Sequence, residues 1–230
     1  MEFRIDARKI AASLMLIVVL LLLAHVAGCI ARYLLHYDQG FGLIDTFNLN
    51  FENNVPTFFA AFMLLASAGL LAVLARVSAK GEGAGHWTGL AILFAFLAVD
   101  EDASLHELLI DPLQQVLPAT GPLYFAWVVP YGLALVIVVL LYARFILSLP
   151  AQTRRQFVAA AGLYVAGALG CELAGGWYLS RHDGEENFAY SMLVAVEETL
   201  EMSGLVAFIY ALLDHLRGRM EGQPLRIAIA

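Results

Sequence analysis

The stretch that decides the fold is Leu97-Ala98-Val99-Asp100-Glu101-Asp102-Ala103-Ser104-Leu105-His106-Glu107-Leu108-Leu109-Ile110. It places four carboxylates and one histidine in a segment that is otherwise apolar enough to cross a membrane. An ionisable group at bilayer depth costs about 2.5–3.5 kcal/mol on insertion scales, so such groups pair with one another, line a wet cavity or hold an ion. Five of them within about two helical turns indicate a functional site.

The composition is that of a polytopic membrane protein. Of the 230 residues, 61% are hydrophobic and only 14% are charged, and the mean hydropathy is +0.76. These values exclude an ordinary soluble domain. The net charge of −7, with no basic stripe, argues against nucleic acid as a partner. Two cysteines in apolar runs form no disulfide framework.

Six segments are long and apolar enough for a transmembrane helix, which needs about 20 such residues. The sequence therefore predicts an all-α membrane helix bundle, built as a single domain over residues 1–230. The predicted spans are Ile10 to Ile30, Val55 to Ala75, Trp87 to Ile110, Tyr124 to Leu149, Phe157 to Leu179 and Phe188 to Leu213.

The distribution of positive charge predicts the orientation of these segments. Eleven of the thirteen Lys and Arg residues lie before the first segment, after the second, around the fourth-to-fifth turn or after the sixth, whereas the alternate loops hold only Arg32 and Arg181. Cytoplasmic loops carry an excess of Lys and Arg. We therefore expect both termini to be cytoplasmic, with a tail over about residues 217–230.

The first segment also fits a second interpretation. A basic start and a long apolar run lead into Val26-Ala27-Gly28-Cys29, a sequence that resembles a lipoprotein signal with Cys29 as the acylated residue. An ordinary first transmembrane helix is the alternative. Both interpretations leave the other five helices in the same orientation.

The second segment begins with signals for the start of a helix. Pro56 stands where the first turn tolerates it, and Asn54 or Asn53 is available as the cap. Glu52 precedes this cap and is expected at the outer interface, above the groups held by the third segment.

Carboxylates recur at similar depth in three of the predicted spans. At 1.5 Å per residue, Asp100, Glu172, Glu197 and Glu201 lie roughly 10–16 Å below the outer ends of their segments. We therefore expect the third, fifth and sixth helices to adjoin, with their acids converging in the outer half of the bilayer. These acids are Asp100, Glu101 and Glu107 on the third segment, Glu172 on the fifth, and Glu197 and Glu201 on the sixth.

A straight third helix would not aim all of its acids inward. At about 100° per residue, Asp100 and Glu107 share one face, Asp102 and His106 share another, and Glu101 points away from both. Either Glu101 and Asp102 serve neighbouring helices, or a π-bulge re-aims one of them.

These carboxylates have no Lys or Arg nearby, so either protonation or a bound cation must compensate their charge. Carboxylates with a histidine suit iron, manganese or zinc, and helix bundles hold such metals with inward-facing Glu and His side chains. His25 on the first segment is available as a second nitrogen. The predicted metal ligands are Asp100, Glu101, His106, Glu107, Glu172, Glu197 and Glu201.

Three runs carry a resemblance to a known group of sequences. They are Asn48 to Thr57, the Asp-Glu-x-x-x-x-His-Glu run from Asp100 to Glu107, and the Glu-Glu-x-x-Glu-Met-x-Gly run from Glu197 to Gly204. Together they resemble a family of uncharacterised bacterial multi-pass membrane proteins. The resemblance implies a location in the bacterial inner membrane and no particular activity.

Three functions of different classes fit these features. The first is a metal-dependent redox enzyme that acts on a lipid or quinone reaching the site through the outer leaflet. The second is a protein that transports or conducts protons or cations with the same carboxylates. The third is a non-catalytic structural subunit of a membrane complex, whose acids are protonated and hydrogen-bonded.

Overall fold

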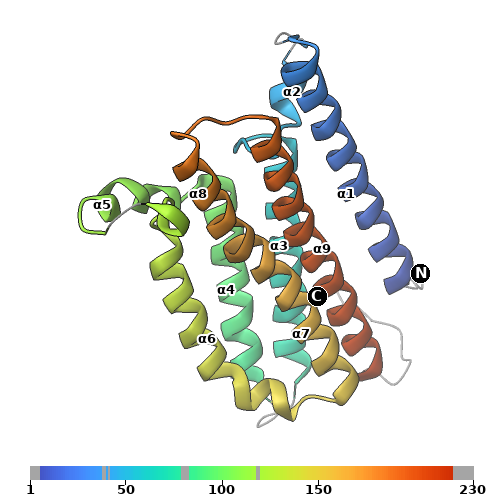
Figure 1. The fold of residues 1–230 in the computed structure, drawn as a ribbon. Coiled ribbons are helices and arrows are strands. Elements are labelled where there is room, and N and C mark those ends of the chain that lie inside the picture. The colour runs from blue at the N-terminus through green and yellow to red at the C-terminus, as the bar shows by residue number, and fades with distance from the viewer. Residues whose placement is uncertain (1–5, 38–39, 41, 79–82, 118–119, 220–230) are drawn as a thin grey trace.

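The computed structural model of the protein describes residues 6–37, 40, 42–78, 83–117 and 120–219, and every regular element among them is helical (Figure 1). The predicted all-α architecture is thus confirmed. Most of the predicted tail, residues 220–230, lies outside the described residues. The longer elements are α1 (Ala7–Cys29), α3 (Val55–Val77), α4 (Ala84–Ala103), α6 (Val128–Ser148), α7 (Ala151–Val165), α8 (Glu172–Arg181) and α9 (Phe188–Arg219).

Short elements join or extend these helices. Two π-helical stretches, η1 (Ile30–Leu34) and η4 (Ala166–Cys171), continue α1 and link α7 to α8. The remaining elements are α2 (Leu43–Thr46), η2 (Glu107–Leu109), α5 (Ile110–Gln114) and η3 (Gly121–Leu123).

Helices α1 and α3 each begin at a side-chain cap. The Asp6 carboxylate accepts hydrogen bonds from the backbone N–H groups of Arg8 and Lys9 at the start of α1. At the start of α3, the Asn54 side chain accepts a hydrogen bond from the Thr57 N–H at 3.2 Å, and Pro56 lies in the first turn. The predicted start of the second segment is therefore confirmed, with Asn54 as the cap.

The number of membrane spans differs from the prediction. Four helical stretches of the described chain, rather than six, are long and apolar enough to cross a bilayer: Ala7–Leu34, Val55–Val77, Val128–Ser148 and Ala151–Arg181. The predicted third and sixth spans correspond to α4 and α9, which have 20 and 32 residues. Their length suffices, but the carboxylates within them lower their apolar character.

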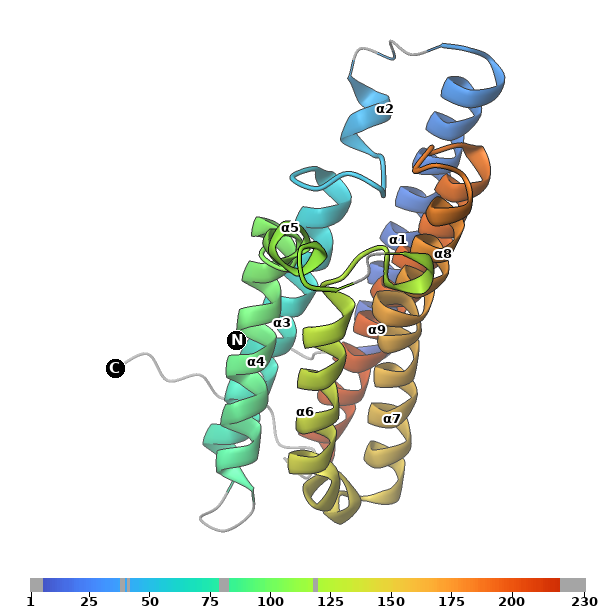
Figure 2. The same ribbon diagram turned by 60° about the vertical axis from the view of Figure 1, so that its left-hand side comes forward.

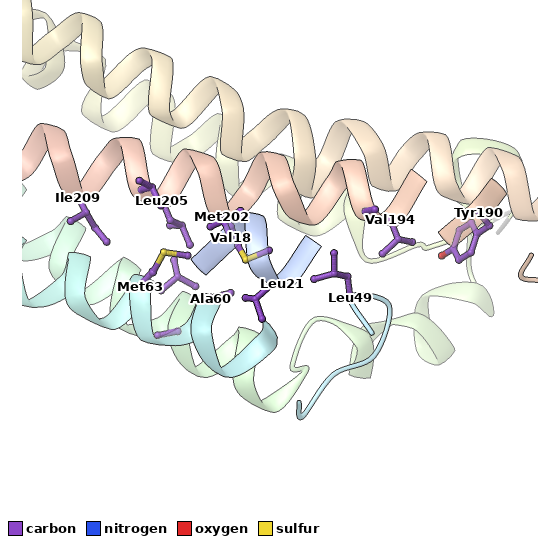
Figure 3. Close-up of a cluster of buried hydrophobic side chains, with 14 of the residues drawn as sticks. Val18, Leu21, Leu49, Ala60, Met63, Tyr190, Val194, Met202, Leu205 and Ile209 are labelled. Atoms are coloured by element: carbon purple, nitrogen blue, oxygen red, sulfur yellow. The ribbon is translucent and has the colours of Figure 1, made fainter. Parts of the chain in front are cut away.

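The core lies where α9 packs against α1 and α3 (Figure 3). Its side chains are almost fully covered by protein, as Met63, Leu64 and Met202 show with at most 1% exposure. Gly204 allows α7 to approach α9 closely, because a Cβ atom there would lie 2.7 Å from the Tyr164 backbone nitrogen. Among the residues labelled in Figure 3, the three helices meet through Val18 and Leu21 of α1, Ala60 and Met63 of α3, and Val194, Met202, Leu205 and Ile209 of α9.

A second apolar cluster lies toward the end of the bundle where α3 turns into α4 and α6 turns into α7, at the bottom of Figure 1. Trp87 of α4 is fully buried there, with its ring 4.8 Å from that of Phe145 and 6.1 Å from that of Phe157. These aromatic contacts hold the lower end of α6 against the bundle.

Helix α6 is otherwise set apart from the bundle. Of its 21 residues, only Val128 and Phe145 are buried, whereas α3 packs along α4, and both α1 and α7 pack along α9. In Figure 1, α6 runs along the left-hand side of the bundle, and in Figure 2 it stands between α4 and α7. This arrangement leaves space on the inner side of α6.

Candidate metal centre

The space beside α6 is a cavity of about 1260 Å³. Its walls come from α4, α6, α7 and α9, and the segment that leads into α3 contributes Asn50, Phe51 and Glu52. Much of the wall is aliphatic or aromatic, and the polar part is built from acids. The described lining residues include nine Asp or Glu side chains and no Lys or Arg, so the negative charge of the site has no fixed cationic partner in its wall.

All seven predicted metal ligands line this one cavity. The structure therefore brings together acids from the third, fifth and sixth predicted segments. At the level of these acids, the cavity separates α4 from α9, and the two helices have few direct contacts. Lower in the bundle the two helices do meet, through the stacked rings of Phe94 and Phe208 at 4.8 Å. The role of the seven residues as ligands stays a prediction.

The predicted third helix ends earlier than expected. Helix α4 stops at Ala103, and Ser104 adopts a left-handed conformation with φ of 51°. The Asp100 carboxylate then accepts a hydrogen bond from the His106 backbone N–H at 2.8 Å and one from the Tyr131 hydroxyl at 2.9 Å. Asp100 is 5% exposed, so this buried carboxylate holds the turn that carries His106.

This turn explains why the helical projection failed for His106 and Glu107, whereas Glu101 lies before the turn, within α4. Glu101 was expected to point away from the other acids, but it lines the cavity, and the exposed Asp102 does not. Both His106 and Glu107 follow the break at Ser104, so the 100° rule does not apply to them. The element that re-aims them is a left-handed residue, and the two π-helices of the described chain lie elsewhere.

Three side chains come close enough to share an ion: Glu52, His106 and Glu107. One donor atom from each lies within 4.8 Å of the other two, and His106 Nε2 is 3.7 Å from Glu52 Oε1. Donors bound at about 2.0–2.2 Å to one zinc ion stand at most about 4.4 Å apart, so small side-chain rotations complete such a site. The second Glu52 oxygen is buried and has no hydrogen-bond partner among the described residues.

The Asp100 carboxylate also orients the imidazole. Its Oδ1 atom lies 3.5 Å from His106 Nδ1, which leaves Nε2 directed toward Glu52. A carboxylate that engages the far nitrogen of a metal-binding histidine is the usual way in which proteins fix the orientation of that ligand. Asp100 is therefore better placed to position His106 than to bind a metal itself.

The electrostatic environment is consistent with a centre that exchanges protons for a cation. Burial and the charge of Glu107 raise the pKa of Glu52 from 4.5 to about 7, although His106 acts in the opposite direction. A bound cation would favour the ionised carboxylate and the neutral imidazole.

A second group of acids lies deeper in the cavity, around Glu172 and Glu197. The two carboxyl groups are hydrogen-bonded to each other, and Trp127 donates its indole N–H to Glu172 at 2.9 Å. The neighbouring π-helix contains Gly167, where a Cβ atom would lie 2.6 Å from Glu201 Cγ and 2.7 Å from the Glu197 carbonyl oxygen. Gly167 thus lets η4 approach α9 at the level of the glutamates.

His25 does not join the cluster. Its Nδ1 atom accepts a hydrogen bond from the Leu49 N–H at 3.0 Å, and its Nε2 atom lies 3.1 Å from the Ser191 carbonyl oxygen. Both ring nitrogens are occupied, so the suggestion that His25 supplies a second nitrogen ligand is wrong. The histidine instead ties α1 to α9 and to the segment before α3.

Several contributors to the site were not among the predicted ligands. Glu52 was expected only above the site, although it lies within the run from Asn48 to Thr57 that carried the family resemblance. Trp127, which donates a hydrogen bond to Glu172, and Tyr131, which donates one to Asp100, were also not among the predicted ligands. Both are placed by the folding of α6 over the cavity, which local sequence patterns do not reveal.

Comparison with known proteins gives one match. The model of a family described as Domain of unknown function (DUF8692) matches residues 12–216. No curated protein and no solved structure matches the chain. Since the matched range covers most of the sequence, the expected membership of an uncharacterised family is confirmed, and the chain belongs to the DUF8692 family.

Proposed function

We propose that this protein is a membrane-embedded metalloprotein that holds iron, manganese or zinc at Glu52, His106 and Glu107 and acts on a lipid or a quinone. The observation that carries the proposal is the group of three donor atoms within 4.8 Å of one another. An imidazole with two carboxylates is a ligand set that suits these metals. Glu101, Glu172, Glu197 and Glu201 supply further acidic groups in the same cavity.

A membrane location follows from the same proposal. The positively charged ends of α3 and α9 lie at the end of the bundle that holds the α6–α7 turn (Figure 1). With that end in the cytoplasm, as the positive-inside rule requires, the metal lies in the outer half of a bacterial inner membrane. All six predicted segments then cross the bilayer, with α4 and α9 shielding their acids inside the bundle.

Metal analysis of protein purified without chelators tests this proposal. The wild type is expected to hold stoichiometric iron, manganese or zinc, and Glu52→Gln and Glu107→Gln to lose it. Asp100→Asn is expected to lower metal affinity about 10–100-fold, as loss of a group that orients a ligand does. Asp102→Asn is the matched control, because Asp102 is exposed and lies outside the cavity lining.

The result that overturns the proposal is a wild type that stays metal-free after incubation with each of the three metals. In that case Glu107→Gln and the wild type behave alike in metal analysis. The acids are then protonated groups of a binding or structural protein.

A second candidate function, proton or cation transfer, is favoured by the hydrogen-bonded pair of Glu172 and Glu197. A hydrogen bond between two carboxyl groups needs a proton on one of them. Flux assays in vesicles, combined with metal analysis of the same protein, distinguish the two functions. Proton movement that Glu197→Gln abolishes while the metal content stays normal supports transfer as the main activity.

A further inference from the structure

We infer that the cavity beside α6 binds one long-chain amphiphile, with its tail along α6 and a neutral, oxygen-bearing head group, such as an alcohol or a quinone, at the acidic end. The inference rests on the proposed function in one respect: the head is placed against Glu52, His106 and Glu107. It specifies the class of substrate that reaches this site.

The shape of the cavity supports a long tail. Lining residues run along α6 from Tyr131 to Leu147, which corresponds to about 24 Å of helix. One leaflet accounts for about half of the roughly 30 Å hydrocarbon core of a bilayer. The volume of about 1260 Å³ exceeds the roughly 300–1,000 Å³ of most small-molecule pockets.

The walls beside the tail are apolar and incompletely covered by protein. Val139 of α6 and Val158 of α7 line the cavity, yet 56% and 61% of their surfaces remain uncovered. Inside a membrane, such surfaces contact hydrocarbon chains. The weak packing of α6 gives a chain a way to enter.

The opposite end of the cavity selects against an anionic head group. Its lining holds nine acids and no described Lys or Arg, so a phosphate or carboxylate head meets like charge there. The rings of His106 and Trp127 lie 4.7 Å apart, and those of Trp127 and Tyr131 lie 5.2 Å apart. These aromatic faces and hydroxyl groups offer stacking and hydrogen bonds to a neutral ring or an alcohol.

Photolabelling in membranes tests this inference. The probes are sixteen-carbon chains with a photoreactive diazirine group near the tail end and with an alcohol, a carboxylate or an amine as the head. We expect the alcohol probe to label lining residues of α6 and α7. The carboxylate probe should label them at least about tenfold less, because the acids of the cavity repel its negative charge.

A matched pair of variants on α7 shows whether the label enters the cavity. Ala161 lines the cavity and Ala159 does not, and both are exposed. Ala161→Trp is expected to reduce labelling by the alcohol about tenfold by filling part of the tail path. Ala159→Trp is expected to leave it unchanged, and both variants should keep the wild-type metal content.

Two outcomes overturn the inference. Equal labelling by the alcohol and the carboxylate, insensitive to Ala161→Trp, means that bulk lipid fills the cavity. Labelling by the amine alone means that the ligand is cationic. Metal analysis of the same samples separates the two proposals. If a wild type without bound metal is labelled selectively by the alcohol, only the metal site is refuted. If the wild type has its expected metal content but is not labelled selectively, only amphiphile binding is refuted.

Discussion

The two sides of the bundle are built on different principles. Where α9 meets α1 and α3, Val18, Met63 and Leu64 are at most 1% exposed. On the other side, α6 borders a cavity of about 1260 Å³, and Leu140, near its middle, is 71% exposed. The contrast shows that the first side supplies the tight packing of the fold, whereas the second leaves a space large enough for a ligand.

On the open side, α6 is attached to the rest of the bundle mainly at its two ends. Near the top of α6 in Figure 1, Tyr131 donates a hydrogen bond to Asp100 at 2.9 Å. Near the bottom, Phe145 packs against Trp87. Between these two attachments no residue of α6 is buried, so we expect the helix to move relative to α4 and α7 when a long ligand enters.

The largest predicted effect comes from a truncation on the packed side. Leu21→Ala removes a side chain of the packed core that is 5% exposed and lies outside the cavity lining, and such substitutions in a core cost about 2–5 kcal/mol of unfolding free energy. Leu140→Ala, the matched change on α6, should cost little, because this side chain is 71% exposed. Thermal unfolding in the same detergent compares the two variants, and equal losses would contradict a division into packed and open sides.

The acidic end of the cavity gives a pH-dependent prediction for the metal-free protein. The pKa of Glu52 in the folded protein, about 7, is above its ordinary value of 4.5. The stability contributed by protonated Glu52 is thus fully present below pH 4.5 and is lost as the pH rises through 7. At about 1.4 kcal/mol per pKa unit, the difference is at most about 3 kcal/mol.

The measurement compares unfolding temperatures of the wild type and Glu52→Gln at pH 5 and pH 8 in the presence of a chelator. Because Gln is always neutral, the variant should become more stable than the wild type as the pH rises. Asp102→Asn serves as the control, since Asp102 is exposed and outside the cavity. A difference between wild type and Glu52→Gln that does not change with pH would refute the prediction.

Much of the helical architecture could be predicted from the sequence. Apolar runs located the long helices, and Asn54 with Pro56 marked the start of α3 correctly. The third segment was predicted to end at Ile110 but stops at Ala103, because Asp100 bonds to the His106 backbone and stabilises a turn there. Such a bond between residues six positions apart leaves no periodic signal in the sequence.

The sequence predicted which residues form the site better than it predicted how these residues are arranged. The sequence identified seven residues, six acids and one histidine, that line one cavity. This was possible because an ionisable group buried in a membrane must pair with another group, line a wet cavity or hold an ion. The three closest donors include Glu52 from the loop before α3, which only the tertiary fold brings to His106. The cavity itself was also beyond prediction, because it results from the absence of packing against α6.

The smallest predicted effect concerns the upper attachment of α6. Tyr131→Phe removes the hydrogen bond to Asp100, and the loss of one such bond costs about 0.5–1.5 kcal/mol. The ring remains in place, so the open side should loosen without a change in the packed core. Spin labels at Leu140 on α6 and Leu65 on α3, both exposed, should then give a broader distance distribution than in the wild type.

Tyr142→Phe, lower on the same helix, removes a hydroxyl that forms no hydrogen bond within the described chain and should leave the distribution unchanged. If Tyr131→Phe also leaves it unchanged, α6 is held by more than its two ends, and the cavity is a fixed feature of the fold that no movement of α6 opens to a ligand.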